Sequence, residues 1–375
     1  MVDPILDPES VARLRRMLLD WYDAHRRDLP WRGSRDPYAI WVSEIMLQQT
    51  RVAVVIEHYQ SFLERFPSLP ALALASEDNV LALWSGLGYY RRARMLHKAA
   101  QFVMEHHNGI LPSTAAELRL LPGIGGYTAA AIASIAYGER IGVVDGNVER
   151  VICRLQDWPA VGRAAGARLR RNIDFLVNQL VHPKRPGDFN QALMELGATL
   201  CTPRSPQCLA CPISVDCSTR GEHKTAPRPA MLSTEIGCAL SVRSTAHAHS
   251  SQLEVLLEQR PTSESVMPGM WQLPLLRDPH MPVGDVRMAV RHAIMQVNYY
   301  VRVRTVLAED VDTLTRPGGE RRWVPQVEAA SMALTGLARK ILTRAHLLAP
   351  PVPRPSLKAA DDHSFASPAS ANLID

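Results

Sequence analysis

The chain has 375 residues, enough for two domains that each bury a hydrophobic core. Hydrophobic residues make up 46% of it and charged residues 21%, a balance typical of a globular protein and unlike that of a disordered chain. The formal net charge of +5 permits nucleic-acid binding without requiring it. No apolar run reaches the roughly 18 residues of a membrane span, and the first ten residues do not resemble a signal peptide, so we expect a cytoplasmic protein.

Helical periodicity dominates residues 1–217. Asp7 followed by Pro8 is typical of a helix N-terminus, and apolar residues then recur at helical spacing from Val11 to Trp21. Similar patterns predict helices over residues 38–48, 52–65, 77–84, 90–107, 126–137 and 147–155. We therefore expect an all-α domain over residues 1–217.

The composition changes after Cys217. Residues 218–233 are polar and contain prolines, as an interdomain linker does. Alternating apolar residues then predict strands over 236–242, 253–258 and 299–306, followed by a helix from about Pro325 to Arg344. We expect an α+β domain over residues 234–347 and a disordered tail over residues 348–375, which is rich in Pro, Ala, Ser and Asp.

Four of the six cysteines lie close together, at Cys201, Cys208, Cys211 and Cys217. Four such thiolates can hold a [4Fe–4S] cluster or a tetrahedral zinc ion. Zinc ribbons usually contain two C-x2-C pairs, whereas only Cys208 and Cys211 form one here, and this spacing favours iron–sulfur. The isolated residues Cys153 and Cys238 are expected to be small buried side chains.

Residues 121–128 have the sequence LPGIGGYT and lie between two predicted helices. Gly123 and Gly125 permit a tight turn and allow backbone N–H groups to approach a phosphate. Such contacts bind the sugar-phosphate chain without reading its sequence. By itself the pattern also fits a purely structural helix–helix corner.

Two acidic residues are candidates for catalysis. Asp145, in VVDGNVER, directly precedes a predicted helix, where an aspartate is most often an N-cap. Glu44, in WVSEIMLQQT, lies among apolar residues of a predicted helix, although most glutamates at such spacing are solvated. If Glu44 is buried, its pKa will rise towards the range of a general acid.

These segments occur in the order found in the helix-hairpin-helix superfamily of endonuclease III and MutY. The spacing C-x6-C-x2-C-x5-C over residues 201–217 resembles the cluster loop of that superfamily, which implies one [4Fe–4S] cluster per chain. LPGIGGYT and VVDGNVERV resemble its hairpin motif, near residues 114–137, and the aspartate that faces the target sugar. WVSEIMLQQT is the segment most specific to the MutY type.

The resemblance to MutY-type adenine DNA glycosylases implies a monofunctional enzyme of base-excision repair. Glu44 would protonate adenine at N7, and Asp145 would stabilise the positive charge that develops on the deoxyribose. Tyr127 and Asn147 would complete the catalytic group. Tyr127 stands where lyases of the superfamily place a nucleophilic lysine, and residues 99–183 contain no lysine. The implied partner is double-stranded DNA with adenine opposite 8-oxoguanine or guanine, bound by a monomer.

The same resemblance assigns the contacts with DNA. Leu87 and Tyr89 would push into the duplex as the adenine flips out. Gly123 and Gly125 would contact the DNA backbone. The full set of expected substrate-binding residues is Arg27, Trp31, Arg32, Gln49, Thr50, Leu87, Tyr89 and Gln191.

Segments LLEQRP, MPGMWQLP and WVP resemble the Nudix-like C-terminal domain of MutY. Between Leu273 and Arg291 the acidic residues are Asp278 and Asp285, too few for a metal-binding Nudix box, so we expect no pyrophosphate hydrolysis. Where the family has a Phe-Ser-His loop, this chain has residues 294–296, Ile-Met-Gln. This departure predicts a weaker preference for 8-oxoguanine.

Two alternatives remain from the sequence. One is an endonuclease III-like glycosylase for damaged pyrimidines, which Tyr127 and the second domain disfavour. The other is a non-catalytic iron–sulfur DNA-binding protein, which the presence of both Glu44 and Asp145 disfavours.

Overall fold

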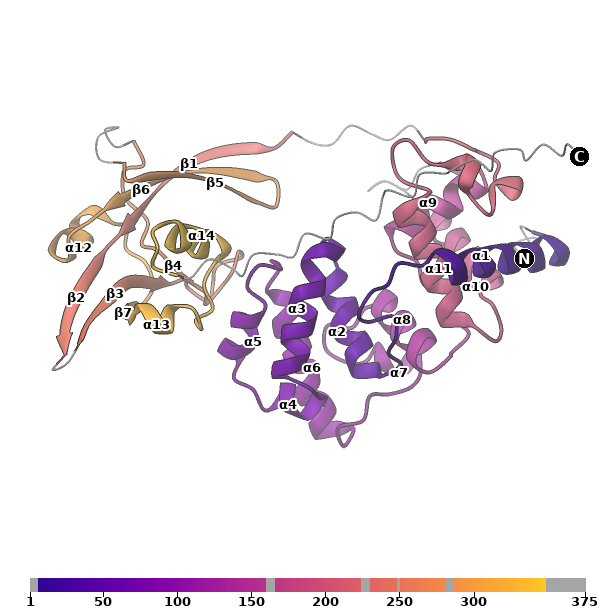
Figure 1. The fold of residues 1–375 in the computed structure, drawn as a ribbon, viewed down its shortest axis with the longest axis horizontal. Helices are drawn as coiled ribbons and strands as arrows, with labels where there is room; N and C mark the ends of the chain where they lie inside the picture. Colours follow the sequence, from indigo (N-terminus) through magenta and orange to yellow (C-terminus); the bar gives the residue numbers. More distant parts are fainter. Residues whose placement is uncertain (1–5, 160–165, 224–229, 248–249, 281–285, 349–375) are drawn as a thin grey trace, which may run out of the picture.

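The computed structural model describes residues 6–159, 166–223, 230–247, 250–280 and 286–348, which form a helical domain and an α+β domain (Figure 1). The expected disordered tail lies outside these residues, apart from Leu348, and so does part of the expected linker. Within the described ranges, no helix combines the length and the apolar character needed to cross a membrane.

The helical domain follows its sequence pattern closely. Asp7 caps the first helix by accepting hydrogen bonds from the backbone N–H groups of Glu9 and Ser10. The helices are α1 (Pro8–His25), α2 (Pro37–Leu47), α3 (Val52–Arg65), α4 (Leu69–Ala73), α5 (Glu77–Leu83), α6 (Arg91–His106), α7 (Ala115–Leu118), α8 (Gly126–Ala136), α9 (Gly146–Leu155), α10 (Ala167–Leu180) and α11 (Pro186–Thr199). Two 3-10 turns, η1 (Cys208–Ala210) and η2 (Ser214–Asp216), complete the domain.

Two hydrophobic cores support the helical domain. One packs α2 to α8 around Trp41, Phe62 and Trp84, and the other packs α1, α9, α10 and α11 around Tyr22 and Phe189. Helix α11 contacts both α8 and α9, and α2 contacts α8. Side chains of α2, α8, α9 and α11 therefore meet where these helices contact one another.

The second domain contains two sheets. Strand β6 (Val297–Thr305) is central in one, parallel to β1 (Leu232–Leu240) and antiparallel to β5 (Met288–Ile294). Strand β3 (Ser250–Gln259) is central in the other, antiparallel to β2 (Val242–His247), β4 (Trp271–Gln272) and β7 (Arg321–Pro325). The remaining elements are η4 (Ala308–Asp310), α12 (Val311–Leu314), α13 (Gln326–Ala329) and α14 (Gly336–Arg344).

The expectation of one helix from Pro325 to Arg344 is wrong. The chain forms α13 and then leaves the helix, because Trp271 of β4 donates a hydrogen bond to Ala333 and accepts one from Thr335 through the backbone. Thr335 then caps α14 by accepting from the N–H of Ala338. Pairing with a strand thus outweighs the helical periodicity of this segment.

The domains share a buried interface. Met270 and Ala333 of the second domain are completely or almost completely buried, and they belong to the same hydrophobic core as α2 to α8. The hydroxyl of Tyr90 donates to the backbone carbonyl of Leu334 at 3.3 Å. The second domain is therefore packed directly against the helices that carry the candidate site.

Candidate active site

Glu44 is buried, with 5% of its surface exposed, because nearly all of α2 lies inside the domain. The hydroxyl of Tyr127, at the start of α8, donates a 2.7 Å hydrogen bond to its Oε2. Burial raises the pKa of Glu44 to about 7, against the lowering effect of that bond. Burial and the nearby carboxylates of Glu44 and Asp145 raise the pKa of Tyr127. The interpretation of Glu44 as a solvated helix residue is therefore wrong.

Asp145 is both an N-cap and part of this site. Its Oδ1 accepts a 2.7 Å bond from the N–H of Val148 at the start of α9, and its Oδ2 accepts a 2.9 Å bond from Asn147 Nδ2. Burial nevertheless raises the pKa of Asp145, and its charge in turn raises the pKa of Glu44. The two carboxyl groups are thus close enough to influence each other.

A cavity of about 640 Å³ contains both acids. It lies between α2, α8, α9 and α11, and its volume suits a single nucleobase with its sugar. The structure brings together in its wall most of the residues that the sequence singled out, namely Arg27, Trp31, Arg32, Glu44, Gln49, Thr50, Tyr127, Asp145, Asn147 and Gln191.

Glu195 organises one wall of this cavity and was missed by the sequence analysis. Arg27 donates to both of its carboxylate oxygens at 2.7 Å, and Arg32 donates to Oε2 at 2.5 Å. Although burial opposes it, these bonds lower the pKa of Glu195 to about 2. The signal was present, because Glu195 lies four residues after Gln191 and hence on the same face of α11.

Leu87 and Tyr89 lie outside this cavity. Together with Gln49 they line a second one, of about 1210 Å³, between the two domains. Leu87 is buried, whereas Tyr89 is 49% exposed and has a left-handed backbone, with φ at 49°. Gln49 lines both cavities, so the turn that follows α2 separates them. Of the two expected intercalating residues, Tyr89 is the one that the structure presents to solvent.

The predicted hairpin forms between α7 and α8. Gly123 has φ at 74°, and a Cβ added to it would lie 2.5 Å from the Cβ of Met95, so this position requires glycine. Gly125 has φ at −86° and serves as the N-cap of α8, with open space where a side chain would be. Backbone N–H groups at the start of α8 are therefore accessible to a phosphate.

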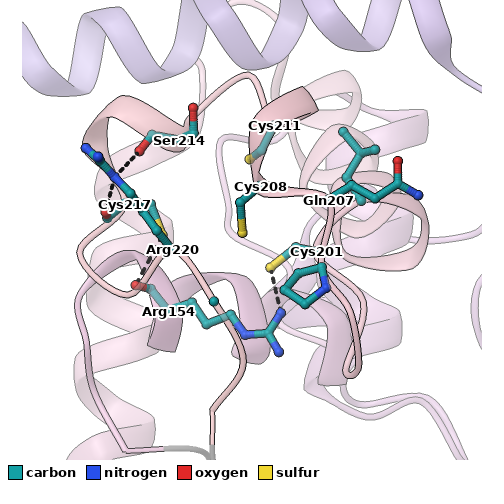
Figure 2. A pocket seen from close by; sticks show the side chains of 11 residues that line it. Arg154, Cys201, Gln207, Cys208, Cys211, Ser214, Cys217 and Arg220 are labelled. Atoms are coloured by element: carbon teal, nitrogen blue, oxygen red, sulfur yellow. Dashed lines mark hydrogen bonds between the residues drawn. The ribbon is translucent and has the colours of Figure 1, made fainter.

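The four clustered cysteines line one small cavity (Figure 2), together with Arg154, Gln207 and Arg220. Arg154 Nη1 donates to the sulfur of Cys201 at 3.3 Å, and burial raises the pKa of Cys211 to about 11. Among the described residues, no three His, Cys, Asp or Glu side chains group as closely as a single metal ion requires. Four thiols around a common space are the donor set that a zinc ion or an iron–sulfur cluster would use. Cys153 and Cys238 are buried, as expected.

Comparison with known proteins points in one direction. Residues 42–168 match a family described as HhH-GPD superfamily base excision DNA repair protein. The chain is 50% identical over 224 residues to a human protein named adenine DNA glycosylase, covering 57% of this chain and 40% of that relative. A protein of the same name from Buchnera aphidicola subsp. Schizaphis graminum is 36% identical over 203 residues, covering 54% and 58%.

A solved structure titled as a thermostable thymine-DNA glycosylase matches with a TM-score of 0.51 and 29% identity. The match covers 56% of this chain and 97% of that one. The chain spans about half the length of the curated relatives it matches. These similarities concern the portion of each chain that is covered, and they support the helical glycosylase fold.

Proposed function

We propose that the chain is a MutY-type member of the HhH-GPD superfamily and an adenine DNA glycosylase. It would hydrolyse the N-glycosidic bond of adenine paired with 8-oxoguanine or guanine in double-stranded DNA. The observation that carries the proposal is Glu44, a buried carboxyl group with a pKa near 7 in the same cavity as Asp145. A second, charge-stabilising carboxylate beside a protonated one is an arrangement suited to cleaving a glycosidic bond.

Glu44 supplies the proton in this mechanism. With its pKa raised to about 7, the Glu44 carboxyl can hold a proton at neutral pH. The protonated form donates to N7 of the flipped adenine, which makes the base a better leaving group. When the C1′–N9 bond breaks, water adds to C1′ and returns its proton to the Glu44 carboxylate. The hydroxyl of Tyr127, 2.7 Å from Oε2, holds the carboxyl group in position.

Asp145 stabilises the positive charge on the sugar as the bond breaks. Its hydrogen bonds from Val148 and Asn147 fix the direction of the carboxylate. No lysine is among the described residues that line the cavity, and Tyr127 occupies the position that resembles the lysine site of the lyases. Water is therefore the proposed final nucleophile, and the product is an intact abasic site.

The base would be held by the opposite wall of the cavity. The Gln191 amide offers a donor and an acceptor, which match the N6 and N7 edge of adenine. Glu195 keeps Arg27 and Arg32 in fixed positions beside it, so the wall is formed before substrate binds. Trp31 lines the same wall and provides an apolar surface for the ring.

Glu44→Gln tests the proposal directly. The amide preserves the shape of the side chain but has no proton to donate, so single-turnover release of adenine should fall by more than a thousandfold with little change in duplex affinity. Glu64→Gln, an exposed substitution on α3, is the control. Duplexes with adenine opposite 8-oxoguanine, adenine opposite guanine, and thymine glycol opposite adenine should be compared. Preferred cleavage of thymine glycol would favour the pyrimidine-specific alternative instead.

We also propose that Cys201, Cys208, Cys211 and Cys217 hold one [4Fe–4S] cluster, whose role when bound is to fix the loop around it. Arg204, exposed on that loop, and the hairpin glycines Gly123 and Gly125 would contact DNA phosphates. The purified protein should contain about four irons and matching sulfide per chain. Cys208→Ser should lower iron content and DNA affinity together, whereas Cys153→Ser should lower neither. Stoichiometric zinc without visible absorbance would contradict the assignment.

The α+β domain is proposed to be Nudix-like and to contact the strand opposite adenine. Ile294 and Met295 lie at the tip of the hairpin between β5 and β6 and line the cavity between the domains. The buried Glu258 is paired with Arg321, so this acid has a structural partner rather than an open metal site. Both observations support a role in binding DNA rather than in pyrophosphate hydrolysis.

A further inference from the structure

The loop Gly86–Tyr89, which carries the exposed Tyr89, has an unusual backbone. Gly86, Gly88 and Tyr89 have φ values of 111°, 69° and 49°. A left-handed backbone at a bulky non-glycine residue such as Tyr89 is uncommon and carries a free-energy cost, so it persists where the surroundings fix it. The contacts that fix this loop therefore decide how Tyr89 is presented to DNA.

The helical domain holds the inner side of the loop. Arg92 donates to the backbone carbonyls of Leu87 and Gly88, each at 3.1 Å, and Trp84 Nε1 donates to the carbonyl of Gly88 at 3.1 Å. These bonds restrain the middle of the loop, and His58 of α3 contacts the backbone carbonyl of Ser85 at 3.0 Å, but none of them engages the hydroxyl of Ser85 or of Tyr90.

The second domain holds both flanking residues. Arg339 of α14 donates from Nε to the hydroxyl oxygen of Ser85 at 2.6 Å, and the hydroxyl of Tyr90 donates to the carbonyl of Leu334 at 3.3 Å. One turn further along α6, Arg94 donates to the carbonyl of Pro268 at 2.7 Å. The Tyr90 ring is 4% exposed, and separation of the domains would break the bond from its hydroxyl to Leu334.

We propose that the α+β domain is a positioning element for base flipping: Arg339 and Leu334 hold Ser85 and Tyr90 so that Tyr89 inserts into the duplex. This inference rests on the proposed function and concerns the flipping step, not the chemistry at Glu44. It gives the second domain a role in every adenine-containing duplex, whichever base lies opposite. That role is independent of the hairpin tip at Ile294 and Met295.

The test compares a duplex that requires flipping with one that does not. The first contains adenine opposite guanine, and the second has a tetrahydrofuran abasic analogue in place of the adenosine. Arg339→Ala should weaken binding to the first about tenfold, the effect of losing one hydrogen bond from a charged donor, and leave binding to the second within twofold. It should also reduce the fluorescence increase of 2-aminopurine placed at the adenine position, which reports unstacking.

Two further variants make the test specific. Ser85→Ala removes the acceptor from the other side of the interface and should reproduce the effect, and the double variant with Arg339→Ala should be no weaker than either single variant. Lys340→Ala, at the neighbouring position on α14, removes a hydrogen bond to the backbone carbonyl of Arg291 within the second domain. It should change the affinity for neither duplex. Melting temperatures measured alongside would show that all variants are folded.

The outcomes separate the two hypotheses. If Arg339→Ala lowers the affinity for both duplexes equally, or for neither, the positioning role of Arg339 is wrong. Failure of the wild-type protein to release adenine or to bind mismatched duplexes preferentially would instead refute the proposed function, and this is measured before any variant is compared.

Discussion

Arg150 donates a 2.7 Å hydrogen bond from its Nε to the backbone carbonyl of Cys201. Its Nη2 donates to Oδ1 of Asn147 at 2.8 Å, and Asn147 in turn donates to Oδ2 of Asp145 at 2.9 Å. A continuous series of hydrogen bonds therefore joins the cysteine loop to the acid proposed to stabilise the sugar cation. Through Arg150 and Asn147, the loop thus supports one of the two oxygens of the Asp145 carboxylate.

Arg150→Ala should therefore impair both sites. Loss of these charge-assisted bonds should slow single-turnover adenine release by about ten- to a hundredfold, because Asn147, one of the two groups that hold the Asp145 carboxylate, loses its own support. Iron content per chain should fall in the same preparation. Arg168→Ala, an exposed substitution on α10, should change neither quantity. If the Arg150→Ala protein keeps the wild-type rate of adenine release and the wild-type iron content, this series of hydrogen bonds supports neither site.

The raised pKa of Glu44 also predicts how stability depends on pH. Its pKa is about 7 in the folded chain against 4.5 for an unperturbed glutamate, so the folded state binds this proton more tightly than the unfolded state. The free energy of unfolding should consequently fall as pH rises from about 4.5 to about 7, and Glu44 should add no further change above that.

Glu44→Gln removes this dependence. The free energy of unfolding of the variant should match that of the wild type near pH 4. At pH 8 it should be higher than that of the wild type by up to ~3 kcal/mol, which is the free-energy equivalent of the pKa shift. Chemical denaturation at the two pH values measures the difference. If the wild type and the variant have the same free energy of unfolding at pH 8, Glu44 ionises without a free-energy cost and is not the buried acid proposed here.

Tyr127 predicts the nature of the product. Since its phenol cannot form a Schiff base, DNA recovered after the reaction should contain an unbroken abasic strand until it is treated with alkali. Borohydride added during turnover should trap no more protein–DNA complex than with heat-inactivated protein. Trapping at the level of a lyase run in parallel would require an amine nucleophile that the described cavity does not contain.

The sequence predicts the local elements of the site well because they are encoded locally. The apolar residues around Glu44 give a buried helix, and the pair Asp145–Gly146 gives a helix start. Glu195 was missed because its importance comes from Arg27 and Arg32, residues more than 160 positions away that only the folded chain brings near. Patterns within a segment do not report such partners.

The second domain was harder to predict for the same reason. Strand β5 has an alternating burial pattern, but its sequence contains charged and small residues that weaken the periodicity, and it was not anticipated. The break between α13 and α14 results from pairing with Trp271, about sixty residues earlier in the chain. The contact of Arg339 with Ser85 joins the two domains, and the sequence pattern of neither segment predicts it.

The hairpin tip between β5 and β6 leads to the last prediction, on the base opposite adenine. Met295 is 70% exposed with φ at 54°, and it lines the interdomain cavity together with Ile294 and Gln49. Gln296 is not among the described residues that line the cavity, and its backbone carbonyl accepts a bond from the N–H of Leu232. The tip thus offers apolar contacts where hydrogen bonds to 8-oxoguanine would be needed.

The wild type should therefore distinguish 8-oxoguanine from guanine only modestly. One or two missing hydrogen bonds of ~1 kcal/mol each correspond to about a five- to thirtyfold loss of discrimination. The measurement is the affinity for a non-cleavable adenine analogue opposite each base. The triple substitution Ile294→Phe, Met295→Ser and Gln296→His should increase the ratio of the two affinities by that factor, while Ile294→Val, which keeps the tip apolar, should leave it unchanged. If the wild type already discriminates as sharply as the triple variant, recognition of the lesion must come from residues such as Gln49 and Thr50 in the helical domain.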